Sequence, residues 1–519
     1  MQPVAVQLDS LSPAAQAEAT TLGLRNPFRD LPPSLDFPAW FEVVEENFRA
    51  LSVAECRAVF ERYLGQDVGD LDRFREANAA YCFDAGIERV CLKHMDELDG
   101  LLRRRVELFL GYLLQFKVAG APQTAELQGL LEDRFLKFRG HVGGEERTFG
   151  GLNQLIKSAP DRAERQAAWE AFLPLGAENR EGILNLVAVR NKLAVSLGYR
   201  DFFDLRFKHS EIDEAWFLNI LDELEGATQA PYEEALANIQ RTLGIQTAMP
   251  WDVARGVESL SPLPPDAFSQ ANASRALRAL LSGWGFSEAE LEIPLHDTGN
   301  FTMGGLCFGI EPGKEVAILI SPVNGHALHF RHAGQHNILL NVEDMAFNEG
   351  MAVFFESFVS DPAWVRQNMA LSEVDQVRYC LQARYAALTW MRTLLINIRF
   401  EHALYTRPDE DPDTIYLELQ RRCGGFALPP EAGSRWAADQ MMVSHPIYWH
   451  TYLIAELIAH QTREAIQAED GQLLDNPKVR EFLMERYYKP GASLPWLEKI
   501  ERATGKPLSG DAFFRYLNR

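Results

Sequence analysis

Residues 326–336 read HALHFRHAGQH, and residues 347–356 read FNEGMAVFFE. The first stretch holds four of the twelve histidines of the chain, His326, His329, His332 and His336. In a helix each residue advances by about 100°, so the last three of these histidines would share one narrow stripe, with His326 at its edge. His332 and His336 are four residues apart, which lets two imidazoles on one helix face share a metal. Because Ala333 follows His332, the glutamate of an H-E-x-x-H motif is missing in that frame, and the histidines could equally line a cleft or cap buried carbonyls.

A β-hairpin is expected just before this cluster. Residues 300–321 form two short apolar runs around Glu311-Pro312-Gly313-Lys314. Proline at the second turn position and glycine at the third are typical of a type II turn. We expect no other hairpin in the chain.

Helical periodicity dominates elsewhere. Residues 214–243 form a long helical stretch that Pro231 should kink or divide. Residues 244–272 contain four prolines and are expected to form a loop or a lobe boundary. The other segments with helical spacing of apolar residues are 101–114, 178–197, 273–281, 346–359, 373–405, 448–468 and 479–488.

The composition restricts the class of protein. The chain has 519 residues, a formal net charge of −22 and 47% hydrophobic residues, so a large core is possible. A polyanion is repelled by nucleic acid and by anionic lipid, so we expect neither as a partner. No apolar run is long enough to span a bilayer, and the N-terminal residues lack the pattern of a signal peptide. The six cysteines form no C-x-x-C pair. Reduced thiols and a cytoplasmic location are therefore expected.

Four segments in this order resemble the thimet oligopeptidase and oligoendopeptidase group of zinc metallopeptidases. Residues 325–330 (GHALHF) resemble the end of the zinc helix, usually H-E-x-G-H-A-L-H-F. Residues 347–356 resemble the next helix of that family, whose first glutamate is the third zinc ligand and corresponds to Glu349. Residues 445–453 (HPIYWHTYL) resemble the segment that brings a histidine and a tyrosine over the bound peptide, and residues 186–205 resemble a scaffold helix. The likeness runs from about Phe149 to the end of the chain.

The resemblance implies a mainly α, two-lobed, zincin-like peptidase fold around a deep channel, with one small β-hairpin beside the former zinc helix. It divides the chain into an N-terminal helical part (1–148), the helical scaffold of the upper lobe (149–285) and a peptidase-like lobe (286–519). An edge strand of the hairpin, near Gly305, can bind an extended peptide by main-chain hydrogen bonds. The other expected substrate contacts are His445, Tyr448 and Tyr452.

The zinc motif itself departs from the family. Aligned on His326 as the second ligand, Pro322 replaces the first zinc histidine and Val323 replaces the catalytic glutamate, with Asn324 and Gly325 between. Catalytic zinc sites use three protein ligands and an activated water. His326 and Glu349 alone would hold zinc poorly, and Val323 cannot accept a proton. We therefore expect no catalytic residues and no cofactor.

Three functions follow as hypotheses. The first is a non-catalytic peptidase homologue that binds peptides or a protein partner, such as an active paralogous peptidase, in its channel. The alternative is an active zinc metallopeptidase in which His329, His332 or His336 joins Glu349, with Glu343 or Glu356 as the general base. The third is a structural or regulatory scaffold whose cleft binds no ligand.

Overall fold

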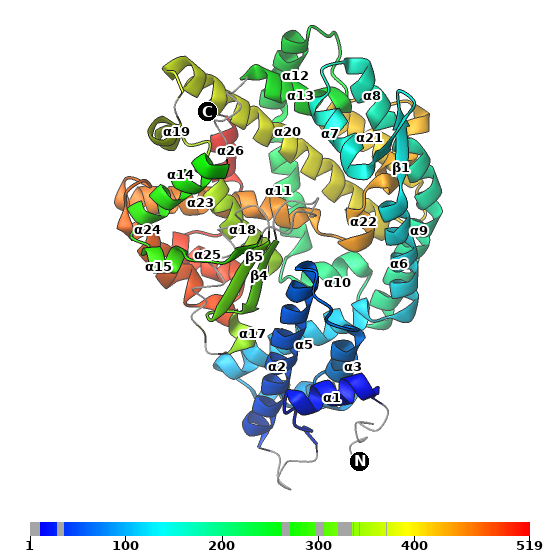
Figure 1. Cartoon of the computed structure of the whole chain (residues 1–519), viewed down its shortest axis with the longest axis vertical. Helices are drawn as coiled ribbons and strands as arrows, with labels where there is room; N and C mark the ends of the chain where they lie inside the picture. Colours follow the sequence, from blue (N-terminus) through cyan, green and yellow to red (C-terminus); the bar gives the residue numbers. More distant parts are fainter. Residues whose placement is uncertain are drawn as a thin grey trace. The chain divides into compact units, whose positions relative to one another are not determined.

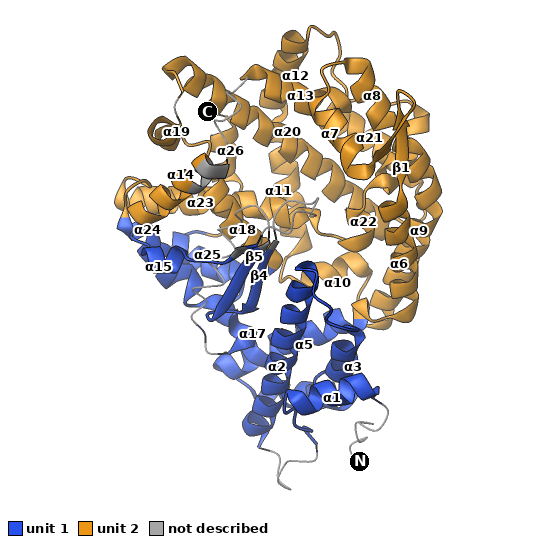
Figure 2. Cartoon of the chain, in the orientation of Figure 1, with its two compact units in different colours: residues 1–117, 284–344, 477–506 blue, residues 118–283, 345–476, 507–519 orange. Residues whose placement is uncertain are grey.

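The computed structural model describes residues 11–28, 36–261, 270–296, 306–319, 335, 337–341, 343–369 and 371–518. The mainly helical fold expected from the sequence is confirmed. The chain forms two compact units, and each is assembled from three separate stretches (Figure 2). Unit 1 comprises Met1–Lys117, Trp284–Asp344 and Pro477–Lys506, and unit 2 comprises Val118–Gly283, Met345–Asn476 and Pro507–Arg519.

Unit 1 is built on α2 (Phe37–Tyr63) and α5 (Gly100–Ala119). Apolar side chains recur along α2 at helical spacing, from Trp40 and Phe41 through Val44 to Phe48, and all are buried. Phe109 of α5 meets both phenylalanines edge-on, with ring centroids 5.6 and 6.1 Å away. The other helical elements of unit 1 are α1 (Pro13–Thr21), α3 (Asp72–Tyr81), α4 (Ala85–His94), η2 (Met95–Glu97), α15 (Glu288–Leu291), α17 (Ile338–Asn341), α24 (Pro477–Phe482), η4 (Leu483–Tyr488), η5 (Gly491–Ser493) and α25 (Trp496–Thr504).

The predicted hairpin is present in unit 1. Strands β4 (Leu306–Glu311) and β5 (Glu315–Leu319) pair antiparallel, and Lys314 N–H donates to the Glu311 carbonyl at 2.9 Å. Gly313 has φ 79°, as the third position of a type II turn requires. The short strand β3 (Leu295–His296) adds parallel to β5, giving the order β3-β5-β4. Within the described strands β4 therefore lies at an edge of this sheet.

A second hairpin, in unit 2, was not predicted. Strands β1 (Arg139–Val142) and β2 (Glu145–Thr148) pair antiparallel around the dipeptide Gly143-Gly144. Both glycines have positive φ, 61° and 84°. A two-residue hairpin loop with positive φ at both positions favours glycine, because it has no Cβ to clash. The expectation of a single hairpin was wrong.

Unit 2 is a helical assembly crossed by α20 (Glu373–Thr406), which has 34 residues (Figure 1). Helix α18 (Met345–Glu356) packs along α23 (Trp449–Asp470). They approach so closely at Gly350 that an added Cβ would lie 2.9 Å from a methyl group of Ile458. The other helical elements of unit 2 are α6 (Pro122–Lys137), α7 (Phe149–Ser158), α8 (Arg162–Glu170), α9 (Leu173–Ser196), α10 (Phe202–His209), α11 (Glu214–Ala227), α12 (Gln229–Leu243), α13 (Pro250–Leu260), α14 (Gln270–Gly283), α19 (Pro362–Asn368), α21 (Pro412–Gly424), η3 (Pro430–Ala438), α22 (Met441–Ser444) and α26 (Asp511–Leu517).

Two proline-containing segments of unit 2 differ from the sequence-based expectation in different ways. The stretch 214–243 is divided as predicted, although the break falls at Thr228, three residues before Pro231. The stretch 244–272 was expected to be a loop, but it contains α13, which begins at Pro250. Proline is favoured in the first turn of a helix because its missing N–H has no partner there. Residues 262–269, with the other three prolines, lie outside the described residues.

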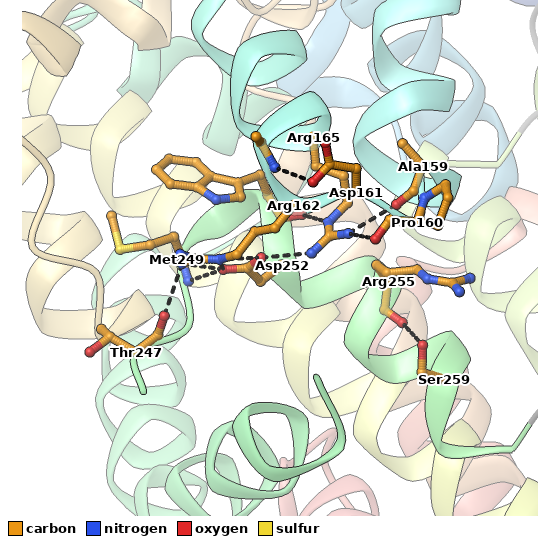
Figure 3. A network of polar contacts seen from close by, with 12 residues as sticks. Ala159, Pro160, Asp161, Arg162, Arg165, Thr247, Met249, Asp252, Arg255 and Ser259 are labelled. Atoms are coloured by element: carbon orange, nitrogen blue, oxygen red, sulfur yellow. Dashed lines mark hydrogen bonds and ion pairs between the residues drawn. The ribbon is translucent and has the colours of Figure 1, made fainter. Parts of the chain in front are cut away.

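The walls of unit 2 are held by buried polar groups. Asp252 near the start of α13 is fully buried and accepts hydrogen bonds from the guanidinium groups of Arg162 and Arg165 on α8 (Figure 3). Arg165 also donates to the carbonyls of Ala159, Pro160 and Trp251. Because buried charges are costly unless paired and hydrogen-bonded, this network fixes α8 against α13.

Candidate functional site

The predicted metal ligands fall largely outside the described residues. This applies to Pro322, Val323, Asn324 and Gly325, to His326, His329, His332 and His336, and to Gly305 beside the hairpin. Their structure is therefore not described. The remaining predicted residues, Glu349, His445, Tyr448 and Tyr452, belong to unit 2, and the structure brings them together.

Glu349 and Tyr448 form the centre of the candidate site. Glu349 lies on α18, and Tyr448 immediately precedes α23. The phenol of Tyr448 donates a hydrogen bond of 2.7 Å to Oε1 of Glu349. The rings of Tyr452 and His445 flank that of Tyr448, with centroids 5.4 and 5.8 Å away. His445 is exposed, whereas the two tyrosines are half-buried.

The electrostatics of this cluster keep both phenols protonated. Burial, followed by the negative charge of Glu349, raises the pKa of Tyr448 well above its ordinary value. The same two causes raise the pKa of Tyr452 to about 12. A neutral phenol has one proton to donate. Tyr448 can therefore donate either to Glu349 or to a carbonyl of a bound peptide, while its oxygen can still accept an N–H.

The turn before Tyr448 has an unusual backbone. Ile447 has φ 54°, a conformation that is strained for a β-branched residue. Its N–H donates to Oε1 of Glu401 at 2.7 Å. Glu401 comes from α20 and is only 2% exposed, and burial raises its pKa to about 8. A buried carboxyl group on the longest helix thus holds the turn that presents Tyr448.

A buried arginine fixes the segment just upstream of this turn. Arg190 of α9 donates to the carbonyls of Met442 and Val443, at 3.1 and 2.7 Å, and to the hydroxyl of Tyr405. The resemblance had assigned residue 190 only to a scaffold helix. Glu401 was not predicted, because a single glutamate in a long helical pattern gives no sign that it is buried.

The two glutamates considered as alternative general bases have different surroundings. Glu343 belongs to unit 1, where it forms an ion pair with Lys499, and both side chains are 1% exposed. Glu356 lies on α18 in unit 2. Burial, followed by the charges of Glu456 and Glu349, raises the pKa of the Glu356 carboxyl group, although part of the residue remains exposed. Glu356 thus lies close enough to Glu349 for the two charges to interact.

The zinc ion that the resemblance implies needs three protein ligands, and Glu349 is the one predicted ligand of the usual motif that the structure describes. Within the described ranges, no group of three or more His, Cys, Asp or Glu side chains is arranged to hold a metal ion. Glu349 accepts the Tyr448 hydroxyl hydrogen bond. The other residues that the resemblance assigns to zinc lie outside the described ranges.

The fold is shared with solved structures that are described as oligoendopeptidases and related peptidases. A solved structure described as an oligoendopeptidase F has a TM-score of 0.67 and 17% identity, over 100% of this chain and 96% of that chain. An oligoendopeptidase F from Bacillus anthracis str. Ames gives 0.67 and 15%, over 97% and 94%. Metallocarboxypeptidase 1 of Trypanosoma cruzi gives 0.59 and 14%, over 92% and 98%. At these identities the likeness shows the fold and not the activity.

The family is supported by sequence as well. The profile of Peptidase family M3 matches residues 155–270, which run from α7 to the first residue of α14. A search of curated proteins gives no match. The family match and the shared fold confirm the resemblance to the oligoendopeptidase-like zinc metallopeptidases. Among the described helices, none is long and apolar enough to cross a membrane.

Proposed function

We propose that this chain is a non-catalytic relative of the zinc oligopeptidases that binds peptides beside Tyr448. The observation that carries the proposal is the sequence Pro322-Val323-Asn324-Gly325-His326 in place of H-E-x-x-H. A general base typically contributes about 10²–10⁴-fold to a rate, and valine cannot act as one. Proline at the first ligand position leaves at most His326 and Glu349 of the usual set.

The cluster around Glu349 supports this reading. Its carboxylate is bonded to the phenol of Tyr448. The side chains of Tyr448, Tyr452 and His445 suit peptide recognition rather than hydrolysis, because they are polar and partly accessible. The hydrogen bond from Ile447 to Glu401 fixes the turn that places Tyr448. A segment of an active paralogous peptidase is one candidate for such a peptide. We also propose a cytoplasmic location, in keeping with six free cysteines.

The second candidate function is an active zinc peptidase with rewired ligands. The raised pKa of Glu356 near Glu349 favours it, because such a carboxyl group suits acid–base chemistry. His329, His332 or His336 would then supply the metal ligands missing from the usual motif. A His332→Ala/His336→Ala variant would lose bound zinc under this alternative and would behave like the wild type under the proposal.

The first experiment separates the two candidates. The purified chain is analysed for zinc and incubated with internally quenched peptides, with and without a chelator. We expect substoichiometric zinc and no chelator-sensitive cleavage. Stoichiometric zinc together with cleavage that a chelator abolishes would overturn the proposal in favour of the rewired peptidase.

The second experiment tests peptide binding. Fluorescent peptides from a mixed-sequence library are titrated into the wild type, Tyr448→Phe and Tyr199→Phe. Tyr199 lies near Lys208 in the same unit, so its variant controls for the loss of a phenol. We expect about tenfold weaker binding for Tyr448→Phe only, because a lost hydrogen bond to a charged or carbonyl group costs about 1–3 kcal/mol. Equal affinity of all three proteins would refute the assignment of Tyr448.

A further inference from the structure

A cavity of about 420 Å³ lies within unit 2, apart from the Glu349–Tyr448 pair. Its walls come from nine helical elements, α7, α8, α12, α13, α20, α21, η3, α22 and α23. This volume falls in the range of about 300–1,000 Å³ that is typical of small-molecule sites. The wall contributed by α8 and α13 is braced by the Asp252 network (Figure 3), so the cavity does not need a ligand to hold that side open.

Arg392 of α20 is the unusual residue in this lining. It is 1% exposed, and its Nη2 donates to the Glu225 carbonyl and to Thr228 Oγ1, each at 3.0 Å. Its Nε and Nη1 have no hydrogen-bond partner among the described residues. A guanidinium group keeps its charge in proteins, and buried charges are normally paired. Arg392 therefore presents three N–H bonds and a positive charge that the surrounding protein leaves unmatched.

The nearest carboxylate does not neutralise Arg392. The Glu225 side chain is bound by Arg399 at 2.9 Å and by Arg422 at 2.6 Å, and Arg399 also contacts Asp222. Glu225 and Glu233 attract Arg392 only without contact, and the ring of Tyr232 lies 5.0 Å below its guanidinium group. Two carboxylates, those of Glu225 and Asp222, therefore pair with Arg399 and Arg422. The positive charge of Arg392 remains at the wall of the cavity without a contacting carboxylate among the described residues.

The other unmatched atoms of the lining are donors too. Nε1 of Trp449 and Nε of Arg435 are buried without a hydrogen-bond partner in the described structure. Among the described lining residues, no side-chain acceptor is buried without a partner. The guanidinium of Arg435 stacks on Phe172, 4.5 Å from the ring centroid. Asp439 is the one carboxylic acid in the lining, and it accepts the Met441 N–H at 3.0 Å. Asp439 disfavours a second anion, so the cavity suits one negative group at the Arg392 side.

Aromatic rings form much of the remaining wall. Phe400 lies 5.1 Å from Trp436 and 5.8 Å from Tyr416, measured between ring centroids, and all three line the cavity. We propose that this cavity binds an apolar molecule through a single carboxylate, which Arg392 receives while the aromatic wall covers the body of the ligand. The carboxylate could be that of a free small acid or the C-terminus of a short peptide. The site does not depend on the proposed peptide binding at Tyr448.

The test measures binding of matched acids and amides to the full chain by calorimetry and by tryptophan fluorescence. The first pair is 3-phenylpropionate and 3-phenylpropionamide, and the second is an acetylated Phe-Phe dipeptide with a free or an amidated C-terminus. We expect at least one acid to bind at least tenfold more tightly than its amide. Binding of the small acid points to a free acid as the ligand, and binding of the dipeptide acid alone points to a peptide terminus.

Variants locate the site. Arg392→Lys keeps a positive charge but not the fork of donors, and Arg392→Met removes both. We expect the acid to bind more weakly to the first and at least thirtyfold more weakly to the second. Trp449→Phe should weaken binding about fivefold, since one neutral hydrogen bond contributes about 1 kcal/mol. Arg399→Lys is the matched control, because Arg399 belongs to the same helix but does not line the cavity.

The melting temperature of each variant shows whether it is folded, and the wild-type comparison of acid with amide stands even if Arg392→Met does not fold. Tyr448→Phe should leave acid binding unchanged, which separates this site from the proposed peptide site. Equal affinity for acid and amide, no binding of either acid at millimolar concentration, or equal losses for Arg392→Lys and Arg399→Lys would each overturn the proposal.

Discussion

The buried carboxyl group of Glu401 predicts an unusual dependence of stability on pH. Burial raises its pKa from 4.5 to about 8 in the folded chain. Folding therefore favours the protonated form. Below about pH 4.5 both states are protonated and the contribution to stability is fully present. As pH rises through the folded pKa the contribution is lost, and the difference between the two values corresponds to roughly 5 kcal/mol at about 1.4 kcal/mol per pKa unit.

Glu401→Gln isolates this effect. The amide oxygen can still accept the Ile447 N–H but the side chain cannot ionise. Urea unfolding followed by circular dichroism at several pH values between 5 and 8.5 should show the variant gaining on the wild type as pH rises. His450 and His209 act in the opposite direction, because burial lowers their pKa values to about 3 and about 4, and their contribution is lost as pH falls below 6.5. They are present in both proteins, so their effect cancels in the difference. Parallel stability profiles for the two proteins would refute the reasoning.

Two further predictions concern buried ion pairs. Asp252→Asn leaves Arg165 without its counter-ion and should destabilise the chain by about 3–5 kcal/mol, whereas Asp222→Asn at an exposed pair should cost about 0–1 kcal/mol, both measured by urea unfolding. Similar losses for the two variants would contradict the role given to the Asp252 network. Lys499→Met should cost a similar 3–5 kcal/mol by removing the buried cation that contacts Glu343, and adding Glu343→Leu should restore most of that loss. A double variant no more stable than Lys499→Met would show that loss of this ion pair is not the cause.

The sequence predicted those elements whose cause is local. The hairpin of β4 and β5 follows from Pro312-Gly313, because these two residues prescribe the backbone of the turn themselves. Long helices such as α20 follow from spacing alone. The missed hairpin of β1 and β2 had a usable signal in Gly143-Gly144, but the charged residues of β2 lack the alternation that marks a half-buried strand.

Other features depend on contacts between distant segments. Each compact unit is formed by three separate stretches of chain. Local sequence patterns carry no information on how these stretches combine. The one helix misread as a loop, α13, is stabilised by Arg162 and Arg165, which lie about ninety residues earlier. The prolines of this segment suggested a loop. The segment forms a helix because Pro250 lies in the first helical turn and because Asp252 pairs with the two arginines.

The candidate site divides in the same way. Glu349, Tyr448 and Tyr452 were predicted through the resemblance, and the structure places Glu349 and Tyr452 each in contact with Tyr448. Glu401 and Arg392 were not, because burial gives both residues their significance. In the sequence each is a single charged residue within a helical pattern, and such a residue is usually expected on a solvent-exposed face.

The strain at Ile447 bears on which of the functional hypotheses is preferable. A β-branched residue at positive φ costs about 1–3 kcal/mol and persists only where its surroundings enforce it. Here the enforcing group is a buried carboxyl group, which itself carries a desolvation cost. The strained backbone of Ile447 and the desolvated carboxyl group of Glu401 both oppose this turn. A purely structural scaffold gives no reason for keeping it. The residue placed by that turn is Tyr448, which still contacts Glu349 although the H-E-x-x-H motif is absent from the sequence. The placement of Tyr448 by this turn therefore favours the ligand-binding hypothesis over a purely structural role.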